Sequence, residues 1–143
     1  GPDQDFVGRE LCFASNEDTI TIVDVSDKQE PTQLSRSTYN HGYTHQGWLT
    51  EDQAYFIFGD EIDEKSKGGK TQTFVLDVRN LSKPVMVGAY SGRTDAIDHN
   101  LYIVGDLVYQ ANYRAGLNVL QIEDISKAKF IEGGYFDVYP NDD

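Results

Sequence analysis

The sequence predicts an all-β protein built of antiparallel β-propeller blades. Short runs of β-branched and aromatic residues alternate with polar turns, which is typical of short strands. No segment sustains the 3.6-residue apolar period of an amphipathic helix, so we expect almost no helix. A unit of about four strands also recurs. Asp24, Asp77 and Gln121 occupy equivalent positions in its three copies, 53 and 44 residues apart. Repeats of this kind are typical of propeller blades, whereas immunoglobulin-like sandwiches do not repeat internally in this way.

The first unit is expected over residues 8–40 and lacks the innermost strand of a blade. Its strands are expected over residues 9–15, 19–25 and 32–37. Cys12 falls between Leu11 and Phe13 in the first of them, and we expect a plain buried thiol there. It is the only cysteine, so the chain forms no internal disulfide and no cysteine-based zinc site.

The second unit, expected over residues 41–94, contains all four strands. They are expected over residues 48–49, 54–58, 73–78 and 85–90. The unit exceeds the third by one loop, residues 62–70, and His41 is expected in a solvated turn at its beginning. Glu61, Asp63 and Glu64 cluster around the start of the loop, where we favour a charged surface over a calcium site because the spacing and glycine of an EF-hand are absent.

The third unit is expected over residues 95–139 and repeats the second. Setting His45 on His99 also sets Trp48 on Tyr102, Tyr55 on Tyr109 and Asp60 on Arg114. Its inner hairpin lies within residues 97–114, and two further strands are expected over residues 117–122 and 129–136. The first unit aligns with it without a gap, from Leu11 on Val108 to Asp24 on Gln121.

These units amount to a partial propeller of about 2.7 blades. A closed propeller typically has about 4 to 8 blades, so we expect either self-association or a partner that supplies the remaining blades. Exposed strand edges and blade faces would otherwise promote aggregation. Gly1 and Pro2 resemble the remnant of a cleaved tag, and residues 1–7 are assigned to this remnant or to an N-terminal extension.

The charge balance excludes several classes of partner. Twelve basic residues against twenty-four acidic ones give a net charge of −12, which repels nucleic acid and anionic membranes. No apolar run approaches the roughly 20 residues that cross a bilayer, so we expect no membrane insertion.

Polar residues gather where the inner strands begin and their neighbours end, and antiparallel pairing brings these positions together near the propeller axis. This predicted rim consists of His45, Gln46, Asp60, Glu61, Asp98, His99, Asn112 and Arg114. We expect His45, Asp60 and His99 to be its possible metal ligands, for zinc or calcium. The alternative is structural: such residues cap strand ends, and Arg114 could pair with Asp60 or Asp98 to lock two blades together. No cofactor is certain on either view.

The phrase TITIVDVSDKQEP resembles the LVIVD repeat. The phrases YTHQGWLTEDQAYFIFGDEIDE and AIDHNLYIVGDLVYQANYRAGLNVL are similar to the choice-of-anchor B family of bacterial surface and secreted proteins, and the likeness runs from about Gly8 to the end. The resemblance implies a β-propeller carried outside the cell and implies no reaction.

Two functional classes follow. The first is an extracellular binding or scaffold module with a protein or glycan ligand, and we favour it. The second is a metal-dependent enzyme that uses the histidines and carboxylates of the rim.

Overall fold

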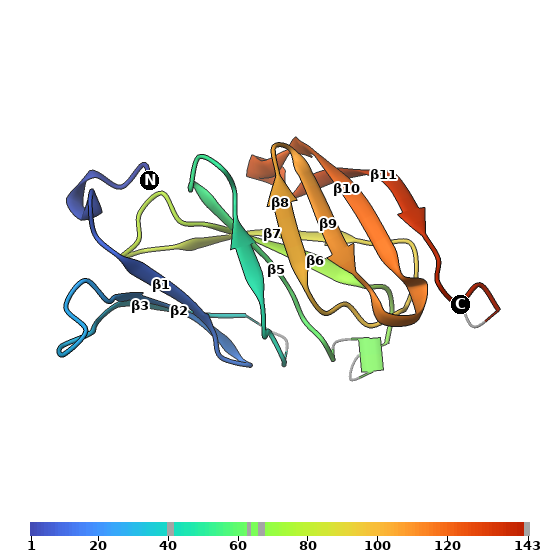
Figure 1. The fold of residues 1–143 in the computed structure, drawn as a ribbon, viewed down its shortest axis with the longest axis horizontal. Coiled ribbons are helices and arrows are strands. Elements are labelled where there is room, and N and C mark those ends of the chain that lie inside the picture. The colour runs from blue at the N-terminus through green and yellow to red at the C-terminus, as the bar shows by residue number, and fades with distance from the viewer. Residues whose placement is uncertain (40–41, 63, 66–67, 142–143) are drawn as a thin grey trace.

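The computed structural model describes residues 1–39, 42–62, 64–65 and 68–141, and these residues form three antiparallel sheets side by side (Figure 1). The first sheet contains β1 (Leu11–Ser15), β2 (Thr19–Asp24) and β3 (Thr32–Thr38). The second contains β4 (Gly47–Leu49), β5 (Tyr55–Gly59), β6 (Gln72–Asp77) and β7 (Val85–Ser91). The third contains β8 (Leu101–Val104), β9 (Leu107–Ala111), β10 (Leu117–Asp124) and β11 (Lys129–Phe136). The predicted fold class is confirmed.

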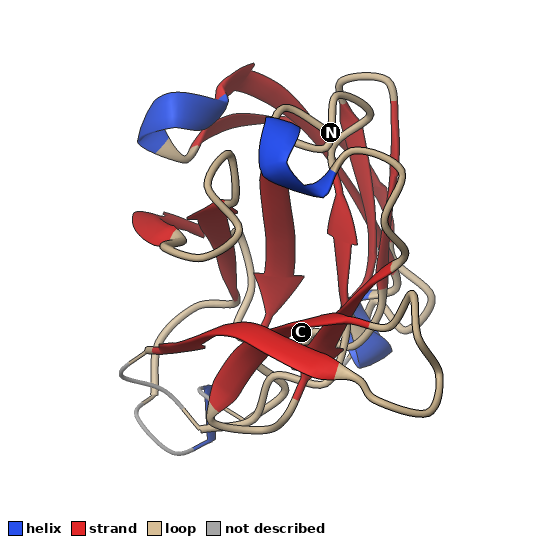
Figure 2. Ribbon diagram, turned by 90° about the vertical axis from the view of Figure 1, so that its left-hand side faces the viewer, coloured by secondary structure: helices blue, strands red, loops and turns tan. Residues whose placement is uncertain are grey.

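Helical structure is confined to short turns outside the sheets (Figure 2). In the part of the chain that the structure describes, the 3-10 turns are η1 (Gln4–Phe6), η2 (Tyr113–Ala115) and η3 (Ile125–Lys127), and residues 64–65 are also helical. Over the described ranges, no helix has the length and apolarity needed to cross a membrane. His41 and Asp63, for which the sequence suggested a solvated turn and an acidic loop, lie outside the described residues.

The second sheet lies between the other two and is buried on both faces. Because side chains alternate along each strand, successive residues pack toward opposite neighbours. Phe56, Phe58, Phe74 and Leu76 pack toward the first sheet, around Ile20 and Ile22. The residues between them turn the other way, so Tyr55, Ile57 and Val75 pack toward the third sheet. A central blade therefore has continuous apolar strands, such as the run Tyr55–Gly59.

Strand pairing corrects the predicted alignment of the repeats. Phe56 pairs with Leu49, and Val108 occupies the same place beside Ile103 in the third sheet. Tyr55 therefore corresponds to Leu107 rather than to Tyr109, and the residues of β5 match those of β9 at a spacing of 52 instead of 54. The cause is the turn between the inner strands, which is two residues longer in the second sheet. The same logic sets Leu11 on Leu107, one residue from the predicted match.

Each sheet also carries one irregularity at the same place. The register between its last two strands shifts after Ile22 in the first sheet, after Val75 in the second and after Val119 in the third. Each shift leaves one extra residue on the outer strand, as in a β-bulge. The three residues are Leu34, Val87 and Gly133.

Cys12 was expected to be buried and is exposed. It lies on the face of the first sheet that points away from the second, whereas its neighbours Leu11 and Phe13 pack against the apolar cluster between these sheets. The strand was predicted correctly, but a β-strand alternates its side chains and only one of its two faces is covered here.

Candidate functional site

The rim lies where inner strands begin and their neighbours end. β4 begins at Gly47 beside the end of β5 at Gly59, and β8 begins at Leu101 beside the end of β9 at Ala111. Backbone hydrogen bonds extend the pairing beyond the strands. The Glu61 amide donates to the Tyr43 carbonyl at 2.9 Å, and the His99 amide donates to the Ala111 carbonyl at 3.0 Å.

His45, Glu61 and His99 come together at this rim. His45 Nε2 lies 4.0 Å from Glu61 Oε2, and His99 Nε2 lies 3.7 Å from Glu61 Oε1. The two imidazole rings are 4.1 Å apart between centroids. One ligand atom from each residue lies within 4.8 Å of the others, so the cluster could hold a metal ion.

Tyr113 completes the cluster and was not anticipated from the sequence. Its hydroxyl donates to Glu61 Oε1 at 2.7 Å, and its ring meets His99 edge-on at a centroid distance of 5.2 Å. The bond to the carboxylate raises the pKa of the Tyr113 phenol above its ordinary value. The corrected alignment could have identified this residue, because Tyr113 occupies the place of Glu61 in the third unit.

Asp60, which the sequence favoured as a ligand, lies outside the metal-capable group. Its carboxylate is fully buried and accepts four hydrogen bonds. The donors are the Tyr39 hydroxyl at 2.9 Å and the amides of Gly42, Tyr43 and Ile62 at 2.8, 3.1 and 3.2 Å. These bonds join the segment that enters the β4–β5 hairpin to the segment that leaves it. Asp60 therefore has the structural role that was the alternative to metal binding, and Glu61 lies beside the histidines instead.

Gln46 joins the second sheet to the third. Its side chain accepts from the Leu101 amide at 2.7 Å and donates to the Leu101 carbonyl at 2.9 Å. The amide side chain therefore pairs with β8 as a neighbouring strand would. Gln110 forms a second, buried link between the same sheets, donating to Thr73 Oγ1 at 2.8 Å.

Asp98 and Asn112 are both buried at the rim, at 3% exposure each. The Asp98 carboxylate lies against Gly59 of the second sheet, so close that a Cβ on Gly59 would fall 1.6 Å from Asp98 Oδ2. Asn112 closes the η2 turn, since its amide donates to the Gly116 carbonyl at 2.8 Å and its carbonyl accepts from Ala115 at 2.9 Å.

Arg114 does not form either of the predicted pairs in the described part of the chain. Its guanidinium donates to Asp95 Oδ1 at 2.8 Å, and both side chains are exposed. The sequence placed Arg114 at the end of the inner hairpin as the counterpart of Asp60, whereas strand pairing matches Asp60 with Asn112. Arg114 thus belongs to the turn outside the buried rim.

Aromatic residues pack between the blades, and Trp48 is one of them. Its ring meets that of Tyr102 on the third sheet at 4.9 Å in an edge-to-face arrangement. Phe13 stacks on Phe56 between the first two sheets at 5.4 Å. These contacts add orientation-dependent attraction to the burial of apolar area.

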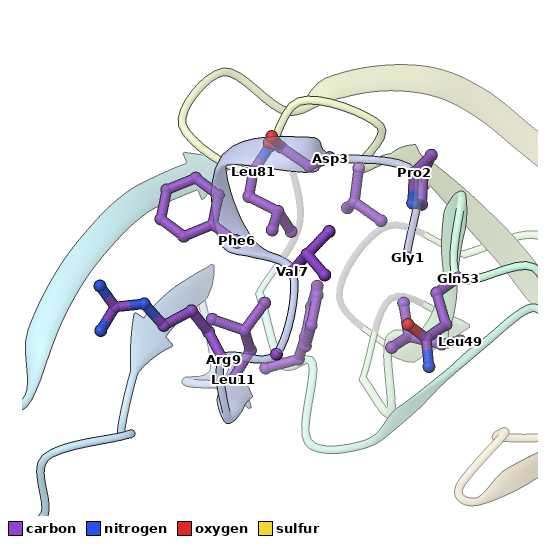
Figure 3. A pocket seen from close by; sticks show the side chains of 13 residues that line it. Gly1, Pro2, Asp3, Phe6, Val7, Arg9, Leu11, Leu49, Gln53 and Leu81 are labelled. Atoms are coloured by element: carbon purple, nitrogen blue, oxygen red, sulfur yellow. The ribbon is translucent and has the colours of Figure 1, made fainter.

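Two hollows lie at opposite ends of the second sheet. One of about 440 Å³ adjoins the cluster and is lined by Asp95, Ile97, Tyr113, Arg114 and the described part of the 62–70 loop. The other, of about 280 Å³, lies under the N-terminal segment (Figure 3). There Asp3 accepts from the Leu81 amide at 2.8 Å and joins the segment to the end of the sheet opposite the rim.

Comparison with known proteins agrees with this architecture. Residues 11–38 and 70–92 match the LVIVD repeat family, and these segments contain β1–β3 and β6–β7. No curated protein matches the chain. The crystal structure of Saccharomyces cerevisiae Sqt1 resembles it with a TM-score of 0.59 at 9% identity, over 90% of this chain and 35% of Sqt1. The chain thus spans about a third of that protein, and the likeness concerns the fold alone. The predicted resemblance to the LVIVD repeat is confirmed for residues 11–38 and 70–92, which lie in sheets that resemble β-propeller blades.

Proposed function

We propose that the chain is part of an extracellular binding or scaffold module, in a bacterial surface or secreted protein of the choice-of-anchor B type. The sequence phrases around His45 and His99 support the family, and a propeller of rigid blades suits a scaffold. Two polar rim residues join neighbouring blades: Gln46 pairs with Leu101 of the third sheet, and Asp60 accepts from Tyr39, which follows β3 of the first sheet. This use of the rim favours presentation of a surface over catalysis.

The observation that carries the proposal is the outer face of the third sheet. Leu117 is 41% exposed, whereas Ile20 and Thr73, which occupy its place in the other sheets, are each 1% exposed. Phe136 is 68% exposed at the place of Tyr90, whose ring packs on Phe130 of the next sheet. The same positions are therefore covered by a neighbouring blade in the first and second sheets and uncovered in the third.

The occupant of this face is another apolar β-sheet. In the isolated chain the same uncovered face of a second copy offers one, so we expect self-association at micromolar concentration. Light scattering should show a mass above that of the monomer, and Leu117→Lys should return it toward the monomer. Cys12→Lys, on the outer face of the first sheet, is the matched control and should leave the mass unchanged. A parent chain that stays monomeric at tens of micromolar would overturn this assignment.

The extracellular location has its own test. Antibodies raised against the chain should label intact cells of the bacterium that produces it, and protease added outside those cells should remove the signal. Signal obtained only after lysis would contradict an extracellular module.

The His45, Glu61 and His99 cluster favours a second candidate function, a metal-dependent enzyme. Two imidazoles with one carboxylate suit zinc, whereas calcium takes six to eight oxygen ligands. Three protein ligands leave one tetrahedral position for water or a substrate. Elemental analysis of protein purified without chelator should find about one equivalent of zinc, and its absence after zinc dialysis would exclude this candidate.

A further inference from the structure

The three possible ligands come from two different blades. His45 stands before β4 and Glu61 follows β5, so both belong to the inner hairpin of the second sheet. His99 stands before β8 and belongs to the third sheet. A single ion bound by all three residues would connect the two sheets close to their inner edges.

The distances fit a transition metal after a small inward movement. Tetrahedral zinc with bonds of about 2.1 Å places its ligand atoms roughly 3.4 Å apart. His45 Nε2 lies 4.0 Å from Glu61 Oε2, His99 Nε2 lies 3.7 Å from the other oxygen, Oε1, and one ligand atom from each of the three residues lies within 4.8 Å of the others. His45 Nε2 is moreover shielded from solvent and has no hydrogen-bond partner among the described residues, so a ligand there would satisfy a buried polar atom.

Tyr113 is placed to orient the carboxylate. It donates to Glu61 Oε1, which leaves Oε2, the oxygen nearer His45, available to an ion. The tyrosine itself is held in a left-handed backbone conformation, with φ of 35°, inside the η2 turn. Such a conformation is unfavourable for a bulky residue and persists where its surroundings fix it. Hydrogen bonds of this kind to metal-binding carboxylates typically tune affinity.

We propose that His45, Glu61 and His99 form a zinc clasp between the second and third blades, and that Tyr113 is its positioning residue. The proposal rests on the metal candidate above and extends it, because the ion here stabilises a blade interface whether or not any reaction takes place. The first sheet offers a natural comparison, since Glu17 occupies the place of Glu61 there.

The test combines cobalt and zinc titrations with thermal melts of the whole chain. The parent should bind one ion per chain, give the intense visible spectrum of tetrahedral cobalt, and melt roughly 5–10 °C higher at a hundredfold excess of zinc over Kd. Glu61→Gln and His99→Ala should weaken binding at least 100-fold and abolish the rise in Tm. Tyr113→Phe should weaken it about 10-fold and alter the cobalt spectrum. Glu17→Gln, the matched control, should behave as the parent.

The outcomes separate the two proposals. Absence of zinc binding by the folded parent would overturn both the clasp and the metal candidate. Zinc binding that survives His99→Ala, or that leaves Tm unchanged, would overturn the clasp alone. Unaltered affinity and spectrum in Tyr113→Phe would overturn its positioning role. Circular dichroism identifies any variant that fails to fold, and the near-isosteric Glu61→Gln and Tyr113→Phe keep the test decisive if His99→Ala is one of them.

Discussion

The two ends of the stack of sheets differ in the side chains that they turn outward. The outer face of the first sheet carries Cys12, Ala14, Thr21 and Val23 at the places where the second sheet has Phe56, Phe58, Phe74 and Leu76. Small and polar residues thus replace the bulky ones that pack against a neighbour. This face of the first sheet is therefore less apolar than the faces that meet a neighbouring sheet.

The outer face of the third sheet keeps the residues of an interface. Val119 stands where Ile22 and Val75 are fully buried, and Leu117 pairs with Phe136 as an exposed apolar pair. The two outer faces thus differ in their side chains, while the pairing of the three strands that both sheets share stays nearly the same. This difference also identifies the face at which we propose that a partner binds.

The largest difference should appear between a valine replaced by aspartate on a covered face and the matching valine replaced by aspartate on the uncovered face. Val75→Asp buries an unpaired carboxylate between two sheets and should lower the free energy of unfolding by about 3–5 kcal/mol. Val119→Asp, at the matching place of the uncovered face, should stay within about 0.5 kcal/mol of the parent. Urea unfolding at submicromolar protein measures both. Equal losses would mean that the third face is covered within a single chain.

The close approach of Asp98 to Gly59 gives a second comparison. Gly59→Ala forces the two sheets apart and should cost about 1–3 kcal/mol. Ala111, the matching residue of the third sheet, is exposed, so its Cβ meets no neighbouring sheet among the described residues. Ala111→Ser should therefore be nearly neutral in the same urea series, and a neutral Gly59→Ala would contradict the tight interface.

Gln46 tests the polar part of the interface. Gln46→Ala removes two hydrogen bonds to Leu101 and should cost about 1–2 kcal/mol. Asn100 precedes β8 as Gln46 precedes β4, and beyond it the described residues provide no further sheet. Asn100→Ala is accordingly the control, expected to change the unfolding midpoint by less than half as much. A larger effect at Asn100 would reverse the assignment of covered and open faces.

The smallest effect concerns pH. The side-chain hydrogen bond from Arg79 holds the pKa of Asp77 below its usual value. A lowered folded-state pKa contributes stability that is present above the unfolded value of about 3.9 and is lost as pH falls through the folded one. The pair is partly exposed, so the contribution should be below about 1 kcal/mol. Thermal melts of Asp77→Asn should show a shallower loss below pH 4, while Gln121→Asn, at the uncharged equivalent, should follow the parent.

The strands and the rim could be predicted because they depend on local pattern. Alternation and turn residues located the sheets, and antiparallel pairing placed His45 near Glu61. The exact partners depend on turn length and on which way a side chain points. A turn two residues longer in the second unit misaligned Asp60 with Arg114, and successive side chains point to opposite sides, so Glu61 rather than Asp60 reached the histidines. The exposure of Cys12 depends on what lies beyond the first sheet, which no local pattern records.

The extra residue on each outer strand bears on how such repeats can be recombined. Because Leu34, Val87 and Gly133 are extra residues, the register with the neighbouring strand shifts by one position at each of them. A chimera that joins two repeats within this strand must cut both on the same side of that residue. Cutting on opposite sides would delete or double it, and every later side chain of the strand would exchange solvent for core.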